Sequence, residues 1–130
     1  MKNLSGSLAM LLAFSLLGFA AQKDATYSGE IMDAACAKAG SHDAMMKAGG
    51  LKTAKDCTQA CIKTGSKYVL YNKATKKVYQ LDDQTKPAQF AGEKVSVKGT
   101  LDAANDTIHV TGIEAAKGAA KSKPEAHPGL

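Results

Sequence analysis

Apolar and polar residues alternate in five short segments of the chain, and this period of two predicts β-strands. In the fourth segment Val95 and Val97 face inward, and Gly99 allows a bulge or a bend. In the first segment Tyr27 and Ile31 fall on the same face. The five predicted strands are 26–33, 68–72, 77–81, 94–101 and 107–113.

The segment 33–65 lacks this alternation and predicts a helical insert between the first two strands. Ser41 is placed to cap a short helix that ends at the glycine pair 49–50. Thr53 begins a capping-box pattern and opens a further helix, which Gly65 terminates. Both helices therefore belong to the insert.

The N-terminus has the layout of a secretory signal peptide. Lys2 is followed by the apolar run 8–19 and then by small residues. The run is shorter than the roughly 20 residues that span a bilayer, which argues against a retained anchor. We expect residues 1–20 to be a signal peptide, cut after Ala20 or, as the near alternative, after Ala21.

Export places the protein in the periplasm or outside the cell. The mature chain then has about 110 residues, the usual size of one domain. We assign that domain to residues 26–114. The segment 115–130 is rich in Ala, Lys, Gly and Pro, and is expected to be a disordered tail.

The order of strand, helical insert, hairpin, connector and hairpin predicts a mainly β fold. Five short strands with even spacing are typical of a small antiparallel barrel. The connector 82–89 is polar, contains Pro87, and is expected to be a loop or a single helical turn. We therefore predict a five-stranded antiparallel barrel that carries the insert 33–65.

Composition narrows the classes of partner. All 17 basic residues are lysines, and the formal net charge is +5. Arginine is best suited to bidentate recognition of phosphate and guanine, so a chain without it is not expected to bind nucleic acid. We expect a soluble monomer without stable membrane insertion. Its positive charge would give at most a weak attraction to anionic envelope surfaces. A ligand in the envelope is expected, but the sequence does not identify it.

The segment from Phe90 to Asp102, followed by Thr107 to Val110, resembles the last two strands of small exported bacterial OB-fold proteins. The shared features are an aromatic residue, a glycine, an alternating valine pair, a glycine bend and a closing strand. The resemblance implies an OB-like barrel. The position of the insert, between the first two strands, departs from the usual OB order.

The first half of the chain is similar to a group of uncharacterised secreted bacterial proteins. These have an Asp-x-x-Cys motif after the first strand, a histidine further on, and Cys-x-x-x-Cys in a helix before a strand. Here the motifs are Asp33 with Cys36, then His42, then Cys57 with Cys61. The resemblance implies no particular biochemical activity.

All three cysteines and one histidine fall within the span 36–61, which suggests a metal site. Cys57 and Cys61 are four residues apart on a predicted helix, so both thiols project from one face. Cys36 and His42 can fold back onto that face and complete a tetrahedral Cys3His site. This ligand set suits zinc.

Copper(I) is a less favoured ion for the same cluster. Met32, Met45 and Met46 lie near His42 in the sequence, and thioethers bind copper(I) together with thiolates. Packing in the core is the simpler role for Met45 and Met46.

A disulfide is the main alternative to a metal, since exported proteins meet an oxidising compartment. Cys36 could pair with Cys57 or with Cys61, which would tie the insert to the barrel. A bridge between Cys57 and Cys61 is a further alternative, but its geometry at helical spacing is less favourable. The third cysteine would then be a free thiol available for redox or other thiol chemistry. The odd number of cysteines and the nearby histidine favour the metal.

No motif typical of an enzyme is found in the sequence. Asp82 and Asp83 show no arrangement that predicts acid–base catalysis. Alternation points His109 outward, and His127 lies in the predicted tail. We therefore expect an exported binding or envelope module that is not an enzyme and that has a structural, zinc-like metal site. An OB-type binder of oligosaccharide or peptide is a further alternative.

Overall fold

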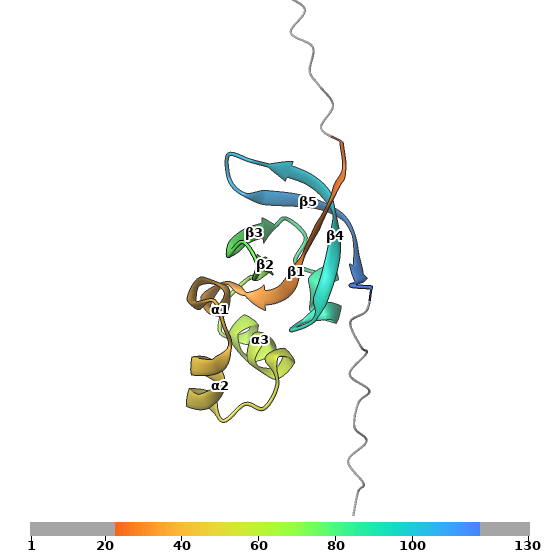
Figure 1. The fold of residues 1–130 in the computed structure, drawn as a ribbon. Helices are drawn as coiled ribbons and strands as arrows, with labels where there is room; N and C mark the ends of the chain where they lie inside the picture. The colour runs from red at the N-terminus through yellow and green to blue at the C-terminus, as the bar shows by residue number, and fades with distance from the viewer. Residues whose placement is uncertain (1–22, 118–130) are drawn as a thin grey trace, which may run out of the picture.

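The computed structural model describes residues 23–117 (Figure 1). The predicted signal peptide, most of the predicted tail and His127 lie outside the described residues. The described chain contains, in order, β1 (Ala25–Asp33), α1 (Ala34–Ala39), α2 (Asp43–Gly49), α3 (Ala54–Lys63), β2 (Tyr68–Asn72), β3 (Lys77–Leu81), the 3-10 helix η1 (Lys86–Phe90), β4 (Lys94–Asp102) and β5 (Thr107–Ala115).

The fold is mainly β, as the alternation predicts. Each of the five predicted strands is present and overlaps its predicted range. The three helices lie between β1 and β2, which confirms the predicted place of the insert. The connector after β3 contains the short 3-10 helix η1, so of the two alternatives expected there, a loop or a helical turn, the structure has the helical one.

The five strands form one sheet that closes on itself in the order β1-β2-β3-β5-β4. Four neighbouring pairs are antiparallel, but β3 and β5 are parallel, so the prediction of a wholly antiparallel barrel is wrong. The reason is geometric. Around a closed ring an odd number of strands cannot all alternate in direction, and at least one pair must run parallel. The parallel seam is short and joins Gln80 with Thr107 and Leu81 with Ile108.

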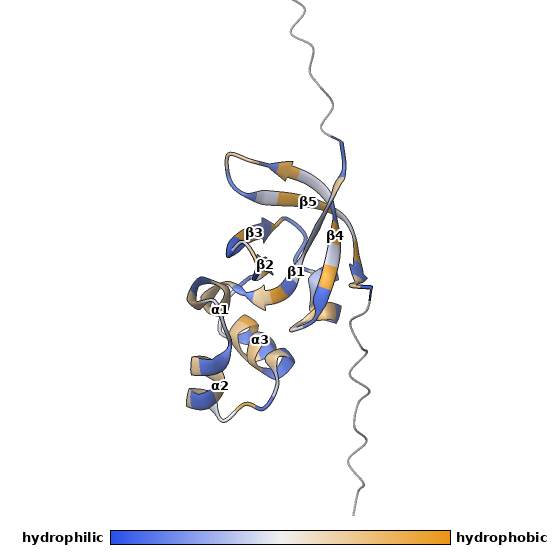
Figure 2. Ribbon diagram, viewed as in Figure 1, coloured by the Kyte–Doolittle hydropathy of each residue, from blue (hydrophilic) through white to orange (hydrophobic). Residues whose placement is uncertain are grey.

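Strand β4 shows both the predicted alternation and the predicted irregularity. Val95 and Val97 are fully buried, and hydrophobic and hydrophilic patches alternate along β4 and β5 in Figure 2. The register with β5 shifts between Lys98 and Gly99. A Cβ at Gly99 would collide with the carbonyl oxygen of His109, so glycine is what allows the two backbones to approach there.

Local hydrogen bonds set the limits of α3. Thr53 Oγ1 accepts a hydrogen bond from the Asp56 N–H at 3.0 Å, which confirms Thr53 as the N-cap. At the other end the N–H groups of Gly65 and Ser66 donate to carbonyls of the last turn, the pattern of a Schellman motif. None of the described helices is long and apolar enough to cross a membrane.

The buried side chains form two clusters on opposite faces of β1 and β2. Successive residues of a strand face opposite sides, so Ile31 points into the ring and Met32 points toward the helices. The cluster within the ring consists of Ile31, Tyr68, Leu70, Leu81, Ala91, Val95, Val97 and Ile108. The cluster under the helices consists of Met32, Cys36, Ala37, Cys57, Cys61, Val69 and Tyr71.

The loop between η1 and β4 joins the ring to the insert. Its Gly92 donates a backbone hydrogen bond to the Ile31 carbonyl at 2.8 Å and has a φ of +74°. A Cβ at this residue would lie 2.5 Å from the nitrogen of Lys55 and 2.7 Å from the carbonyl carbon of Ala54. The loop backbone therefore packs directly on the first turn of α3.

Gly92→Ala is expected to destabilise the protein by about 3 kcal/mol, because it combines a left-handed φ with a collision against backbone. Gly50→Ala is the matched control, since Gly50 has a φ of +61° with nothing within 4 Å of an added Cβ. The control should cost only about 1 kcal/mol. Urea unfolding of the two variants measures the difference, and equal losses would contradict the packing described above.

Candidate metal centre

The candidate site begins where β1 ends and α1 begins. Asp33 is the last residue of β1 and the N-cap of α1, and its Oδ2 accepts a hydrogen bond from the Cys36 N–H at 3.0 Å. The cap satisfies one of the free N–H groups at the start of the helix. It also fixes Cys36 in the first turn. Both residues are fully buried.

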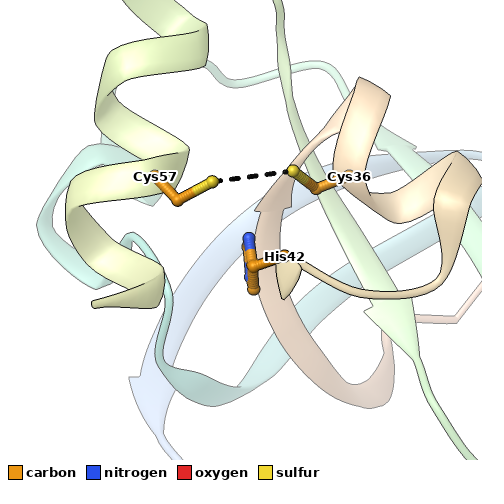
Figure 3. Close-up of side chains that lie close together, drawn as sticks. All are labelled: Cys36, His42 and Cys57. Atoms are coloured by element: carbon orange, nitrogen blue, oxygen red, sulfur yellow. Dashed lines mark hydrogen bonds between the residues drawn. The ribbon is translucent and has the colours of Figure 1, made fainter. Parts of the chain in front are cut away.

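Helix α3 supplies the other two cysteines. Cys57 and Cys61 lie about one turn apart and are both buried, as their four-residue spacing predicts for one helix face. Helix α3 packs against β1, to which α1 also packs. The Sγ atoms of Cys36 and Cys57 are 3.8 Å apart (Figure 3).

His42 comes from the link between α1 and α2. It occupies the N-cap position of α2 without capping the helix through its side chain. Ser41, the predicted cap, lies one residue earlier, and its Oγ accepts a hydrogen bond from the Asp43 N–H at 3.1 Å. The ring of His42 is 8% exposed, and its nitrogen-bearing edge faces the pair Cys36 and Cys57 (Figure 3).

The two ring nitrogens of His42 have different surroundings. Nε2 lies 2.9 Å from Oε1 of Glu30 on β1. Nδ1 is buried and has no hydrogen-bond partner within residues 23–117. A carboxylate on one ring nitrogen holds the proton there and leaves the other nitrogen with a free lone pair, which is how histidine is oriented when it binds a metal ion.

The potential ligand atoms form two overlapping groups that share Cys36. In the first group, ligand atoms of Cys36, His42 and Cys57 all lie within 4.8 Å of one another. In the second group the same holds for Asp33, Cys36 and Cys61. The structure thus brings three of the four predicted ligands together and groups the fourth, Cys61, with Asp33 and Cys36.

The first group has the dimensions of a zinc site. Zinc–thiolate bonds are about 2.3 Å long, so two thiolates on a tetrahedral zinc ion lie about 3.8 Å apart. The sulfurs of Cys36 and Cys57 have this separation, 3.8 Å. Two thiols and an imidazole nitrogen are also donors that zinc binds readily.

Asp33 and Glu30 are the two residues of the site that the sequence does not identify as ligand or support. Asp33 Oδ1 is buried without a hydrogen-bond partner in the described chain, and an unpaired buried carboxylate oxygen is costly. The Asp-x-x-Cys motif points to Asp33, but a helix cap explains only one of its oxygens. Glu30 has no sequence signal, because its contact with His42 depends on the fold.

Burial raises the pKa of the Cys36 thiol well above its ordinary value, and the nearby carboxylate of Asp33 raises that pKa further. Burial and the charge of Asp33 also raise the pKa of Cys61. Without a cation both thiols are therefore protonated near neutral pH, which argues against a reactive thiolate at either position. A bound cation favours the thiolate and reverses this effect.

A cavity of about 330 Å³ adjoins His42. Glu30, Met32 and Met46 help to line it. Met32 is buried and Met46 partly buried in the cluster under the helices, so the predicted packing role holds for Met46. It does not hold for Met45, which is 43% exposed because α2 covers the cluster with its other face.

His109 belongs to neither ligand group. It is exposed on β5, as the alternation predicts, and its Nδ1 lies 3.1 Å from Asp82 Oδ2. A hydrogen bond from the Val110 N–H, supported by His109, lowers the pKa of the Asp82 carboxyl. Lys86 likewise lowers the pKa of Asp83 to about 2. These contacts stabilise the turn after β3.

The second half of the chain is similar to a known family. A family model described as a protein of unknown function (DUF5818) matches residues 62–116. The match begins in the last turn of α3 and contains β2 to β5, so all the residues of the candidate site precede it. No curated protein and no solved structure matches the chain.

In the reduced, metal-free protein, Cys36 is expected to react with iodoacetamide at about pH 8 at least about tenfold more slowly than in the unfolded chain. The reason is that burial and Asp33 keep the thiol protonated. Peptide mass spectrometry after timed alkylation measures both rates. Equal rates would show that the thiol is neither buried nor shifted in pKa.

Proposed function

We propose that this protein is an exported, non-enzymatic module of the bacterial envelope whose helical insert holds a structural metal ion, with zinc as the favoured ion. The ligands come from the predicted set of Cys36, His42, Cys57 and Cys61. Bound there, the ion links the β1–α1 junction to α3. Because ligands of a structural site are scattered in the unfolded chain, binding of the ion stabilises the fold.

His42 is the residue that carries this proposal. Its Nδ1 is buried without a partner in residues 23–117, and its edge faces two sulfurs that are 3.8 Å apart. Its Nε2 is held by Glu30 at 2.9 Å. A histidine that served packing alone would bury one imidazole nitrogen at a cost without compensation. A metal ion at Nδ1 removes that cost.

Zinc is favoured over copper(I) because of the donors that meet at the site. Two thiols and one imidazole nitrogen form the first group, and the sulfur separation matches tetrahedral zinc. Met32 and Met46 belong to the apolar cluster under the helices, where packing accounts for their burial. Copper(I) is therefore the second choice of ion.

A disulfide between Cys36 and Cys57 is the second candidate, because these sulfurs are the closest pair of thiols described. It would tie α1 to α3 and leave Cys61 as a free thiol. A disulfide does not explain why Nδ1 of His42 and Oδ1 of Asp33 are buried without hydrogen-bond partners in the described residues. For this reason the metal is the better explanation of the cluster.

The wider assignment rests on the sequence together with the shape of the sheet. A closed five-stranded sheet with a bulge at Gly99 is compatible with an OB-like barrel, which the resemblance of 90–110 implies. Export rests on the signal-peptide pattern of 1–20. An exported domain of this size gains from a crosslink or a metal, since a small core gives little stability.

Protein purified from the periplasm is expected to contain zinc in stoichiometric amount, with all three thiols protected from a thiol reagent until a chelator is added. Metal analysis and thiol counting measure this. His42→Gln should lower the zinc content and the melting temperature, whereas His109→Gln, at an exposed site, should change neither. A metal-free chain that is two hydrogens lighter, with one free thiol, would establish the disulfide instead.

Glu30→Gln should weaken zinc binding by about 10–100-fold, because the amide no longer fixes the proton on Nε2 of His42. Competition with a chromophoric chelator measures the affinity. Glu93→Gln is the matched control, since Glu93 is exposed and its hydrogen bonds are made by its backbone: its carbonyl accepts from the Ile31 N–H at 3.0 Å and its N–H donates to the Phe90 carbonyl at 2.9 Å. Equal affinities of both variants and the parent would exclude a role for Glu30 in holding the ligand.

A further inference from the structure

Asp33 is a buried charge that an ion at His42 does not explain. Its side chain is fully buried, and Oδ1 has no partner among the residues that the structure describes. The ion pairs in that part of the chain involve Glu30, Asp82, Asp83 and Asp106, and none involves Asp33. A buried carboxylate without a cation is strongly unfavourable.

Cys61 also belongs to the group around Asp33. Its Sγ is grouped with Asp33 and Cys36, whereas His42 and Cys57 form the other group with Cys36. A single ion bound by all four predicted ligands would require the Cys61 side chain to leave Asp33 and turn toward His42. Asp33 Oδ1, which already has no hydrogen-bond partner among the described residues, would then gain no cation either.

We infer that the insert binds two divalent ions, the second held by Asp33, Cys36 and Cys61, with the Cys36 thiolate shared between them. This inference rests on the proposed metal binding at His42. A thiolate sulfur has several lone pairs and can bind two ions at once. Carboxylate oxygen and thiolate are both ligands that zinc accepts.

The charges of the buried cluster support two ions over one. Three thiolates and the Asp33 carboxylate carry four negative charges, and a neutral His42 adds none. Two divalent ions balance these charges, whereas one ion would leave a buried excess of two negative charges. Glu30 stands apart from this balance, because its side chain is 26% exposed and in contact with water.

The number of bound ions tests the inference. The reduced, metal-free full chain is titrated with cobalt(II) and then with zinc, and native mass spectrometry counts the ions. We expect two per chain. Asp33→Asn should bind one, because an amide oxygen can still accept the Cys36 N–H and keep the cap but cannot supply the charge. Cys61→Ser should also bind one, with the affinity of the ion at His42 unchanged.

Asp82→Asn is the control, since it removes the exposed carboxylate beside His109, and it should still bind two ions. The inference would be overturned if the parent chain binds one ion, Cys61→Ser binds none and Asp33→Asn still binds one. That result would leave a single Cys3His site. Two ions in Asp33→Asn would place the second ion elsewhere and overturn it as well. A parent chain that binds no ion would refute the proposed function itself.

Discussion

The buried carboxylate of Asp33 is the interaction on which the arrangement of the insert depends. It ends β1, caps α1 through Cys36, and lies against the sulfur of Cys61. A negative charge in this position has two effects. It holds the first turn of α1 in place, and it makes the surrounding thiols hard to ionise. A bound cation would favour the thiolate forms of Cys36 and Cys61, so the carboxylate that organises the first turn of α1 would also favour the proposed ion.

Strand β1 serves the ring and the insert at once, which explains how a small protein keeps the two together. Ile31 fills the ring while Met32 supports the helices, and Glu30 reaches His42 from the same strand. Gly92 bonds to Ile31 and packs on α3. The parallel seam of β3 and β5 lies across the ring from β1. The least regular pairing of the sheet is thus kept away from the site.

Local chemistry made much of this fold predictable, and long-range geometry accounts for the rest. The period of two predicts the strands, and Thr53 predicts the start of α3, because both signals act between neighbours in sequence. The parallel seam follows only from closure of five strands into a ring. The contact between Glu30 and His42 likewise needs the fold. Spacing on a helix places Cys57 and Cys61 on one face, but it does not decide that Cys61 turns to Asp33.

The odd number of cysteines and the composition of the cluster under the helices have a common explanation. That cluster consists largely of small side chains, including Cys36, Ala37, Cys57 and Cys61. Such side chains bury little apolar area, so packing alone attaches α1 and α3 weakly to the sheet. A disulfide would strengthen one contact between the helices and leave the third cysteine as a free thiol. The proposed metal ions, shared among three thiolates, one imidazole and one carboxylate, would use every one of these groups, and they would supply between the helices and β1 the attachment that small side chains cannot provide.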